Sequence, residues 1–233
     1  MALFTWPDPL FPNSVTAGRL SLHSDRPFDK DKARAILADI ETRLQSSPLD
    51  DHQPHGVYIA NAPWLKSVFF FAGSGATGIN YYPLTNNVFL GHADVDRDTV
   101  YSGATGLPAA PPRTLAYYAA HEITHSFTAE HRGLVKGFNN GMPQWVREGY
   151  PDYVATHGHL DLDDLYRRCL AGDQDLNFKK TKNYASFRML VAYMLERKHE
   201  TIDQLLETKL SAEQALADLN AGMRPPAGQA CSD

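Results

Sequence analysis

Residues 113–127 read Arg-Thr-Leu-Ala-Tyr-Tyr-Ala-Ala-His-Glu-Ile-Thr-His-Ser-Phe, and the segment His121-Glu-Ile-Thr-His125 within this run decides how the chain is interpreted. Two histidines at positions i and i+4 of a helix lie on one face, a turn apart, so both imidazoles can reach one metal ion. Glu122 follows the first histidine, where its carboxylate can reach a water bound to that ion. Because five residues can match by chance, a third ligand elsewhere in the chain is needed to support a metal site.

The composition is that of an ordinary globular protein and argues against several classes. The chain has 233 residues, of which 43% are apolar and 21% charged, enough to build a substantial core. Its net charge of -5 argues against binding to nucleic acid. No apolar run is long enough to span a membrane. The N-terminus, MALFTWPDPLFP, lacks the basic region of a signal peptide, so a cytoplasmic location is the default expectation.

The two cysteines, Cys169 and Cys231, form no motif. Cys231 lies in a Pro/Gly-rich tail that we expect to be frayed. The sequence therefore favours two free thiols over a disulfide between them.

Hydrophobic periodicity predicts an α+β fold. Asp29 is a candidate N-cap for a helix that ends near Ser46, and the stiff segment 108–112 separates a strand-containing half from a helical half. Strands are predicted at 18–23, 56–60, 68–72 and 87–91, and further helices at 111–130, 143–150, 161–169, 183–196, 201–206 and 211–219. We expect a single domain made of a strand-containing part (about 1–110), a helical part (about 111–222) and a tail (223–233).

Two other motifs predict loops rather than binding sites. Gly73–Gly78 matches G-x-G-x-x-G after an apolar run, but strand-forming residues and Pro83 follow where a dinucleotide site needs a helix. Asp94, Asp96 and Asp98 alternate, but the glycine and glutamate of a calcium-binding loop are absent, so we expect a solvated loop. The histidine pairs His52/His55 and His157/His159 are also predicted to lie in loops, the first on the solvated surface and the second near the mouth of the site.

Two residues compete for the third position on a metal held by His121 and His125. His131 has the spacing of the metzincin motif, but Thr128 stands where that motif needs glycine to end the helix sharply. Glu148 lies among Trp145, Val146 and Tyr150, which predict burial, and an isolated buried carboxylate is costly unless it has a partner such as a metal. The third ligand of a catalytic zinc site must be a residue that can turn back to the metal, so we favour Glu148 over His131.

Asp152 follows Glu148 by one helical turn. A carboxylate in that position can accept a hydrogen bond from the second ring nitrogen of a liganding histidine and thereby fix its orientation. We therefore expect Asp152 to support the ligands from behind.

The segment HEITH followed by PQWVREGYPDY resembles the gluzincin zinc metallopeptidases, and within them the peptidase MA-like group. The resemblance covers about residues 87–219 and implies a zincin-like fold, bound Zn²⁺ and hydrolysis of peptide bonds. It also implies that Asn87–Leu90 is an edge strand that pairs with substrate, and that Tyr184 stabilises the oxyanion. Pro151 departs from the family pattern, and we expect it to bend the helix beyond Glu148.

The resulting hypothesis is a zinc metallopeptidase with His121, His125 and Glu148 as ligands and Glu122 as general base. The alternatives are a metzincin-type site that uses His131, and a non-catalytic zincin-like protein whose zinc is structural or binds a partner. For a zinc metallopeptidase, the expected partner is a peptide or protein substrate. We expect no nucleic-acid partner and no membrane segment in this chain.

Overall fold

The computed structural model describes residues 2–70, 75–109, 113–133, 141–181, 183–225 and 228–232. The chain forms two compact units, Met1–Gly137 and Phe138–Asp233. The strands of the described residues all lie in the first unit, and the second unit is helical. The predicted α+β class with a small N-terminal sheet is therefore confirmed, and the long helix that carries His121 belongs to the same unit as the sheet.

The first unit is built on a five-stranded sheet with the order β1-β2-β3-β5-β4. The strands are β1 (Asn13–Ala17), β2 (Leu20–Ser24), β3 (His55–Ile59), β4 (Gly78–Asn80) and β5 (Val88–Leu90). The inner strands β2, β3 and β5 are parallel, whereas β1 and β4 are antiparallel edge strands. A separate pair consists of β6 (Ala93–Asp94) and β7 (Thr99–Val100).

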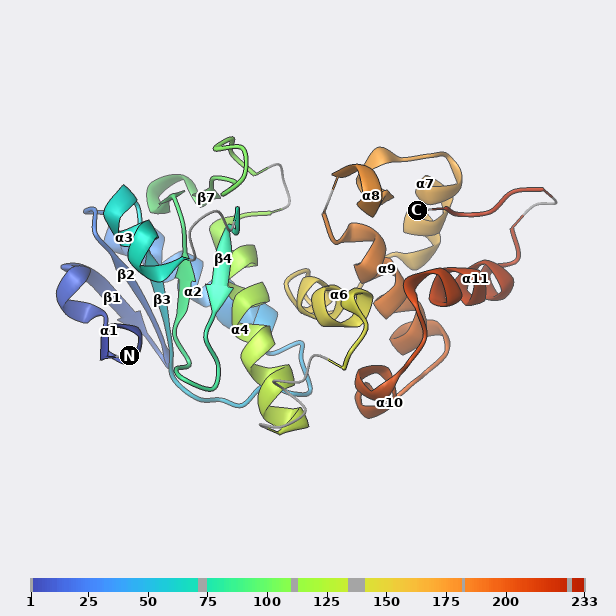
Figure 1. Cartoon of the computed structure of the whole chain (residues 1–233), viewed down its shortest axis with the longest axis horizontal. Helices are drawn as coiled ribbons and strands as arrows, with labels where there is room; N and C mark the ends of the chain where they lie inside the picture. Colours follow the sequence, from blue (N-terminus) through green and yellow to red (C-terminus); the bar gives the residue numbers. More distant parts are fainter. Residues whose placement is uncertain are drawn as a thin grey trace. The chain divides into compact units, whose positions relative to one another are not determined.

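The expectation that Asn87–Leu90 forms the edge strand is wrong. All three residues of β5 are fully buried, as expected for a strand that is covered on both faces and paired on both sides. The edge on this side of the sheet is β4, which runs alongside the long helix (Figure 1).

Two helices of the first unit pack against each other and against the sheet. Helix α2 (Lys30–Leu44) contacts β1 and β2, and helix α4 (Leu115–Arg132) contacts β4 and β5. The predicted N-cap of α2 is confirmed, since Asp29 accepts hydrogen bonds from the backbone N–H groups of Asp31 and Lys32. The buried stripe of α2 is the one read from the sequence: Ala33, Ile36, Leu37, Ile40 and Leu44.

The described residues of the apolar run 68–72, which are 68–70, do not form a strand, and this corrects the sequence prediction. Helix α3 (Pro63–Phe69) begins at a proline, and Leu65 and Phe69 are buried one turn apart. A short continuous apolar run does not distinguish a buried strand from a buried helix. Phe69 stacks on Phe89 of β5, so the helix covers an aromatic face of the sheet. Residues 71 and 72 lie outside the described ranges.

The second unit consists of helices that the sequence largely predicted. They are α6 (Gln144–Val154), α7 (Leu162–Leu170), α8 (Phe178–Thr181), α9 (Ala185–Ala192), α10 (Ile202–Glu207) and α11 (Ala212–Met223). Pro143 is the N-cap residue of α6, and Thr201 and Ser211 form capping boxes at α10 and α11. Helix α9 continues into a π-helical turn, Tyr193–Arg197.

Helices α6 and α9 approach closely at a glycine. A Cβ atom on Gly149 would lie 2.8 Å from the carbonyl oxygen of Phe187, so no larger residue fits between the two backbones. Pro151 lies inside α6, and the helix continues past it to Val154.

The cysteines form a disulfide, which overturns the prediction of two free thiols. Cys169 of α7 is bonded to Cys231 in the C-terminal segment, with a Cα–Cα distance of 5.3 Å. Asn220 holds the same segment by accepting from the backbone N–H of Cys231 (2.9 Å) and donating to its carbonyl oxygen (3.0 Å). The expected fraying of the tail thus does not extend to Cys231, which is buried. Because disulfides persist in oxidising compartments, this bond gives no support to a cytoplasmic location.

Within the described ranges, no helix has the length and apolar character that a membrane crossing requires.

We expect Cys231→Ser to lower the free energy of unfolding of the second unit by about 2–4 kcal/mol, because the bond closes a long loop between positions 62 residues apart. Urea titration with and without reductant measures the effect, and reductant should lower the stability of the wild type but not that of the variant. Two titratable thiols in the unreduced wild-type protein would contradict the assignment.

Candidate metal centre

Helix α4 presents His121 and His125 on one face, as their spacing predicts. The helix begins at Thr114, whose hydroxyl accepts from the N–H of Tyr117, and Asp98 accepts from the N–H of Ala116 at 3.2 Å. The two imidazole rings have centroids 5.0 Å apart and planes at 79°. His121 is 5% exposed and His125 is half-buried, so one ligand lies deeper than the other.

The side chain of Glu122 extends from α4 toward the edge strand β4. A Cβ atom on Gly78 would come within 2.6 Å of its Oε1 atom, so the absence of a side chain there lets the carboxylate reach the strand. One turn further along α4, the side chain of Asn80 donates a hydrogen bond to the hydroxyl of Ser126 at 2.7 Å. These two contacts pair successive turns of α4 with alternate residues of β4.

Tyr118 lies one turn before Glu122 on α4. Burial raises the pKa of Tyr118, Arg113 opposes the shift through its charge and a hydrogen bond, and the nearby charge of Glu122 adds to it. The phenol therefore stays protonated near neutral pH and places an uncharged donor near the carboxylate.

Glu148 belongs to the second unit, on α6. Trp145 and Val146 in the first turn of α6 are buried, and the indole of Trp145 donates to the carbonyl oxygen of Leu210 at 2.8 Å. The Nε atom of Arg147 donates to Oε1 of Glu148 at 3.1 Å. The predicted burial of Glu148 is partial, with 14% of its side chain exposed.

His121, His125 and Glu148 form the described group that can hold a metal ion. Each offers one ligand atom, and these atoms all lie within 4.8 Å of one another. Two imidazoles and one carboxylate are a donor set that suits a divalent transition metal, and three protein ligands leave a position open. The arrangement therefore fits a divalent metal ion.

His131 does not belong to that group of described residues. Helix α4 continues through Thr128, whose hydroxyl donates to the carbonyl oxygen of His125 at 3.0 Å, and ends only at Gly133 with φ 75°. This is the continuous helix that the missing glycine predicted, and it leaves His131 exposed near the end of α4.

Asp152 is buried at 2% exposure, and its Oδ2 atom accepts from Nη1 of Arg188 at 3.0 Å. Arg188 was not predicted from the sequence as a functional residue, although a buried carboxylate implies a cationic partner. The role of Asp152 behind a histidine ligand stays a prediction.

Tyr184, the predicted oxyanion donor, is the N-cap residue of α9 and half-buried. Its ring stacks on Phe187 with centroids 6.0 Å apart and planes at 16°. Packing thus fixes the ring of Tyr184 on the same helix that carries Arg188, while its catalytic role stays a prediction.

Two expectations for loop residues are corrected. His55 lies in β3 and is buried, with its ring nitrogens 3.2 Å from Oδ1 of Asp51 and 3.0 Å from the carbonyl oxygen of Asn86. Asp98 is half-buried, and burial raises its pKa although it accepts hydrogen bonds at the start of α4.

The remaining loop predictions concern the glycine motif 73–78 and the pair His157/His159. No helix follows Gly78, which begins β4, as expected for a segment that is not a dinucleotide site, while Gly73 lies outside the described residues. His159 is exposed beside Glu196, and His157 adopts a left-handed backbone conformation.

No protein-family model matches this chain, and neither does any of the curated proteins with which it was compared.

The Asp152–Arg188 pair yields a stability prediction. Arg188→Met should lower the free energy of unfolding by about 3 kcal/mol, because it leaves a buried carboxylate without its cation. Adding Asp152→Asn should restore part of the loss, as a double-mutant cycle in urea would measure. Arg168→Met, which removes a partly exposed ion pair, is the control and should cost at most about 1 kcal/mol. Equal effects of the two arginine substitutions would contradict the assignment.

Proposed function

We propose that the chain is a zinc metallopeptidase of the gluzincin type. The observation that carries the proposal is the His121, His125 and Glu148 group combined with a carboxylate, Glu122, on the same helix. The preference for zinc rests on the H-E-x-x-H spacing and on a His/His/Glu donor set with an open position.

Glu122 acts as the general base. Zinc, when bound, lowers the pKa of a coordinated water to about 7 and polarises a carbonyl group. Glu122 accepts a proton from the attacking water and later delivers it to the leaving amine. The backbone of Gly78 lies close to the Glu122 carboxylate and restricts its position. A restricted position favours proton transfer, because the base must lie within hydrogen-bond distance of the proton that it accepts.

The edge strand β4 offers the substrate a place to bind. An extended peptide can add to an open sheet edge by main-chain hydrogen bonds. Since β4 also contacts Glu122 through Gly78, a peptide bound along this edge lies near the base. This proposal replaces Asn87–Leu90 with Gly78–Asn80 as the substrate strand.

Tyr184 donates a hydrogen bond to the oxyanion that develops on the attacked carbonyl. The stacking of its ring on Phe187 supports this role, because a fixed donor needs no reorganisation when the charge forms.

Metal analysis tests the ligand set. The wild type should bind about one zinc ion per chain, and His121→Ala and Glu148→Gln should each weaken binding by roughly 100-fold or more. His131→Ala is the matched control and should bind zinc as the wild type does. If His131→Ala loses the metal and Glu148→Gln keeps it, the metzincin-type alternative is correct instead.

Peptide hydrolysis tests the base. Glu122→Gln should keep zinc and abolish cleavage of a mixed peptide pool. Gly78→Ala should keep zinc but lower kcat/KM by roughly 100-fold, because the added Cβ displaces the Glu122 carboxylate.

Gly75→Ala is the matched control, since its Cβ would make an ordinary contact with Ala104 at 3.4 Å, and it should retain activity. Cleavage by the Glu122→Gln variant at the wild-type rate would exclude the proposed mechanism.

A further inference from the structure

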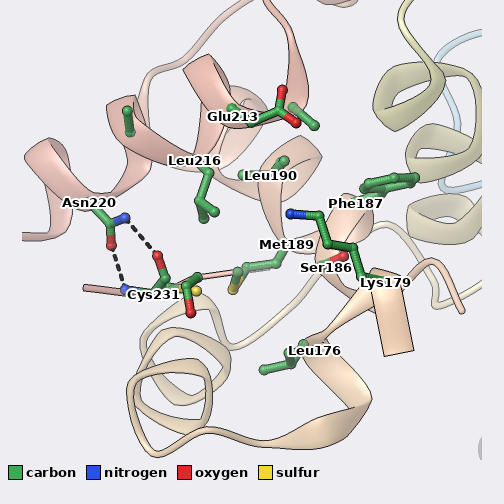
Figure 2. A pocket seen from close by; sticks show the side chains of 13 residues that line it. Leu176, Lys179, Ser186, Phe187, Met189, Leu190, Glu213, Leu216, Asn220 and Cys231 are labelled. Atoms are coloured by element: carbon green, nitrogen blue, oxygen red, sulfur yellow. Dashed lines mark hydrogen bonds between the residues drawn. The ribbon is translucent and has the colours of Figure 1, made fainter. Parts of the chain in front are cut away.

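A pocket of about 250 Å³ in the second unit is lined by residues of α9 and α11, together with Leu176 and Cys231 (Figure 2). Lys179 and Glu213 line it with opposite charges. Hydrogen bonds from its own backbone N–H and from Ser211 lower the pKa of Glu213, and the charge of Lys179 adds to this effect. The charges of this pocket therefore select neither an anion nor a cation, whereas a cluster of polar side chains in the first unit has a more specific geometry.

One face of the hairpin formed by β1 and β2 carries a serine, a histidine and a carboxylate next to one another. Ser21 and His23 lie two residues apart in β2, so their side chains share a face of the sheet. The hydroxyl oxygen of Ser21 lies 2.9 Å from Nε2 of His23. Nδ1 of His23 lies 3.3 Å from Oδ1 of Asp8, which belongs to η1 (Asp8–Leu10). This order of groups is that of a nucleophile, its general base and a residue that positions the base.

The charge of Asp8 determines which ring nitrogen of His23 carries the proton. A carboxylate only accepts hydrogen bonds, so a proton on Nδ1 is favoured beside Oδ1 of Asp8. Nε2 then keeps its lone pair and accepts from the hydroxyl of Ser21. Burial lowers the pKa of His23, and the charge of Asp8 opposes that shift. A neutral imidazole is therefore available near neutral pH to take the proton of the serine.

Tyr58 of β3 holds both the imidazole and the carboxylate in place. Its ring stacks on that of His23, with centroids 4.4 Å apart and planes at 17°. Its hydroxyl donates to Oδ1 of Asp8 at 3.2 Å. Burial raises the pKa of Tyr58, and Asp8 adds to the shift through its charge and this hydrogen bond, so the phenol stays a donor. The base and its positioning residue are thus oriented before any ligand binds, which favours catalysis.

The hydroxyl of Ser21 lies on a part of the sheet that solvent reaches. Ser21 is half-buried, and Thr16, which pairs with it in β1, is exposed. Ser14, which pairs with His23, is exposed as well. Because residues that pair directly across two strands share a face, a small reagent can reach the serine past these short side chains. The side chain of His23 is 12% exposed, so the base is better shielded from solvent than its surroundings.

We propose that Ser21 is a nucleophile that takes an acyl group from small activated esters, with His23 as its general base and Asp8 as a positioning residue. Oγ of Ser21 bonds to the ester carbonyl carbon while its proton passes to Nε2 of His23. The bond to the leaving alcohol breaks, and the leaving oxygen takes that proton. Water then attacks the acyl-serine and gives a proton to His23, which returns it to Oγ as the carboxylic acid departs.

This site shares no residue with the metal centre and does not depend on peptidase activity. Its test can therefore be carried out on the metal-free protein, and its outcome is independent of the zinc proposal.

Acylation of the full chain by p-nitrophenyl acetate in the presence of a chelator tests the proposal. Release of p-nitrophenolate should accompany acetylation of Ser21, which peptide mapping by mass spectrometry locates. His23→Gln should slow acetylation of Ser21 by roughly 100-fold or more, because the general base is lost. Asp8→Asn should slow it by about fivefold, since solvent screens the charge of a partly exposed carboxylate. Ser67→Ala is the matched control and should react as the wild type does, because the exposed Ser67 donates to the carbonyl oxygen of Pro63 instead of to an imidazole.

A second probe separates an activated serine from an ordinary exposed one. A fluorophosphonate forms a bond from phosphorus to an activated serine oxygen and releases fluoride and a proton. It should label Ser21 in the folded wild type and leave Ser21 unlabelled in urea, where the contact with His23 is lost. Acetylation of Ser67 as fast as that of Ser21, an unchanged rate in His23→Gln, or equal labelling of Ser21 in the folded and unfolded chain would overturn the proposal.

Discussion

The packing of α4 against the edge strand β4 is the constraint on which the first unit depends. Gly78 lets the Glu122 carboxylate reach the strand, and Asn80 binds Ser126 one turn later. That face of α4 packs against the sheet. The turn that carries His121 and His125 brings both imidazoles to positions from which they can bind one metal ion. A single helix thus places both imidazoles and the Glu122 carboxylate, and it does so through contacts within one unit.

The elements with strong local signals could be predicted from sequence. Helix starts depend on residues that are close together in the sequence, so they can be recognised without knowledge of the tertiary structure. Examples are Asp29 before α2, Pro143 before α6, and the capping boxes at α10 and α11. The helical spacing of His121 and His125 is local in the same sense. Thr128 also indicated correctly that α4 continues past the position where a metzincin helix ends.

The failures concern properties that only tertiary structure decides. The run at 68–72 is apolar throughout, although Val68 is exposed in α3, so the sequence carries no periodicity that would separate a strand from a helix. Which strand forms the sheet edge depends on pairing, so β5 and β4 could not be ordered from their sequences. The Cys169–Cys231 bond and the Asp152–Arg188 pair join distant positions, and no local pattern marks either.

The proposed function requires one zinc ion held by His121, His125 and Glu148. A crystal structure of the zinc-loaded protein, with diffraction data collected on both sides of the zinc absorption edge, locates the ion directly. We predict one anomalous peak about 2.0–2.2 Å from a nitrogen of each histidine and from an oxygen of Glu148. A peak that includes His131 among its ligands, or a protein that takes up no zinc at this position, would contradict it.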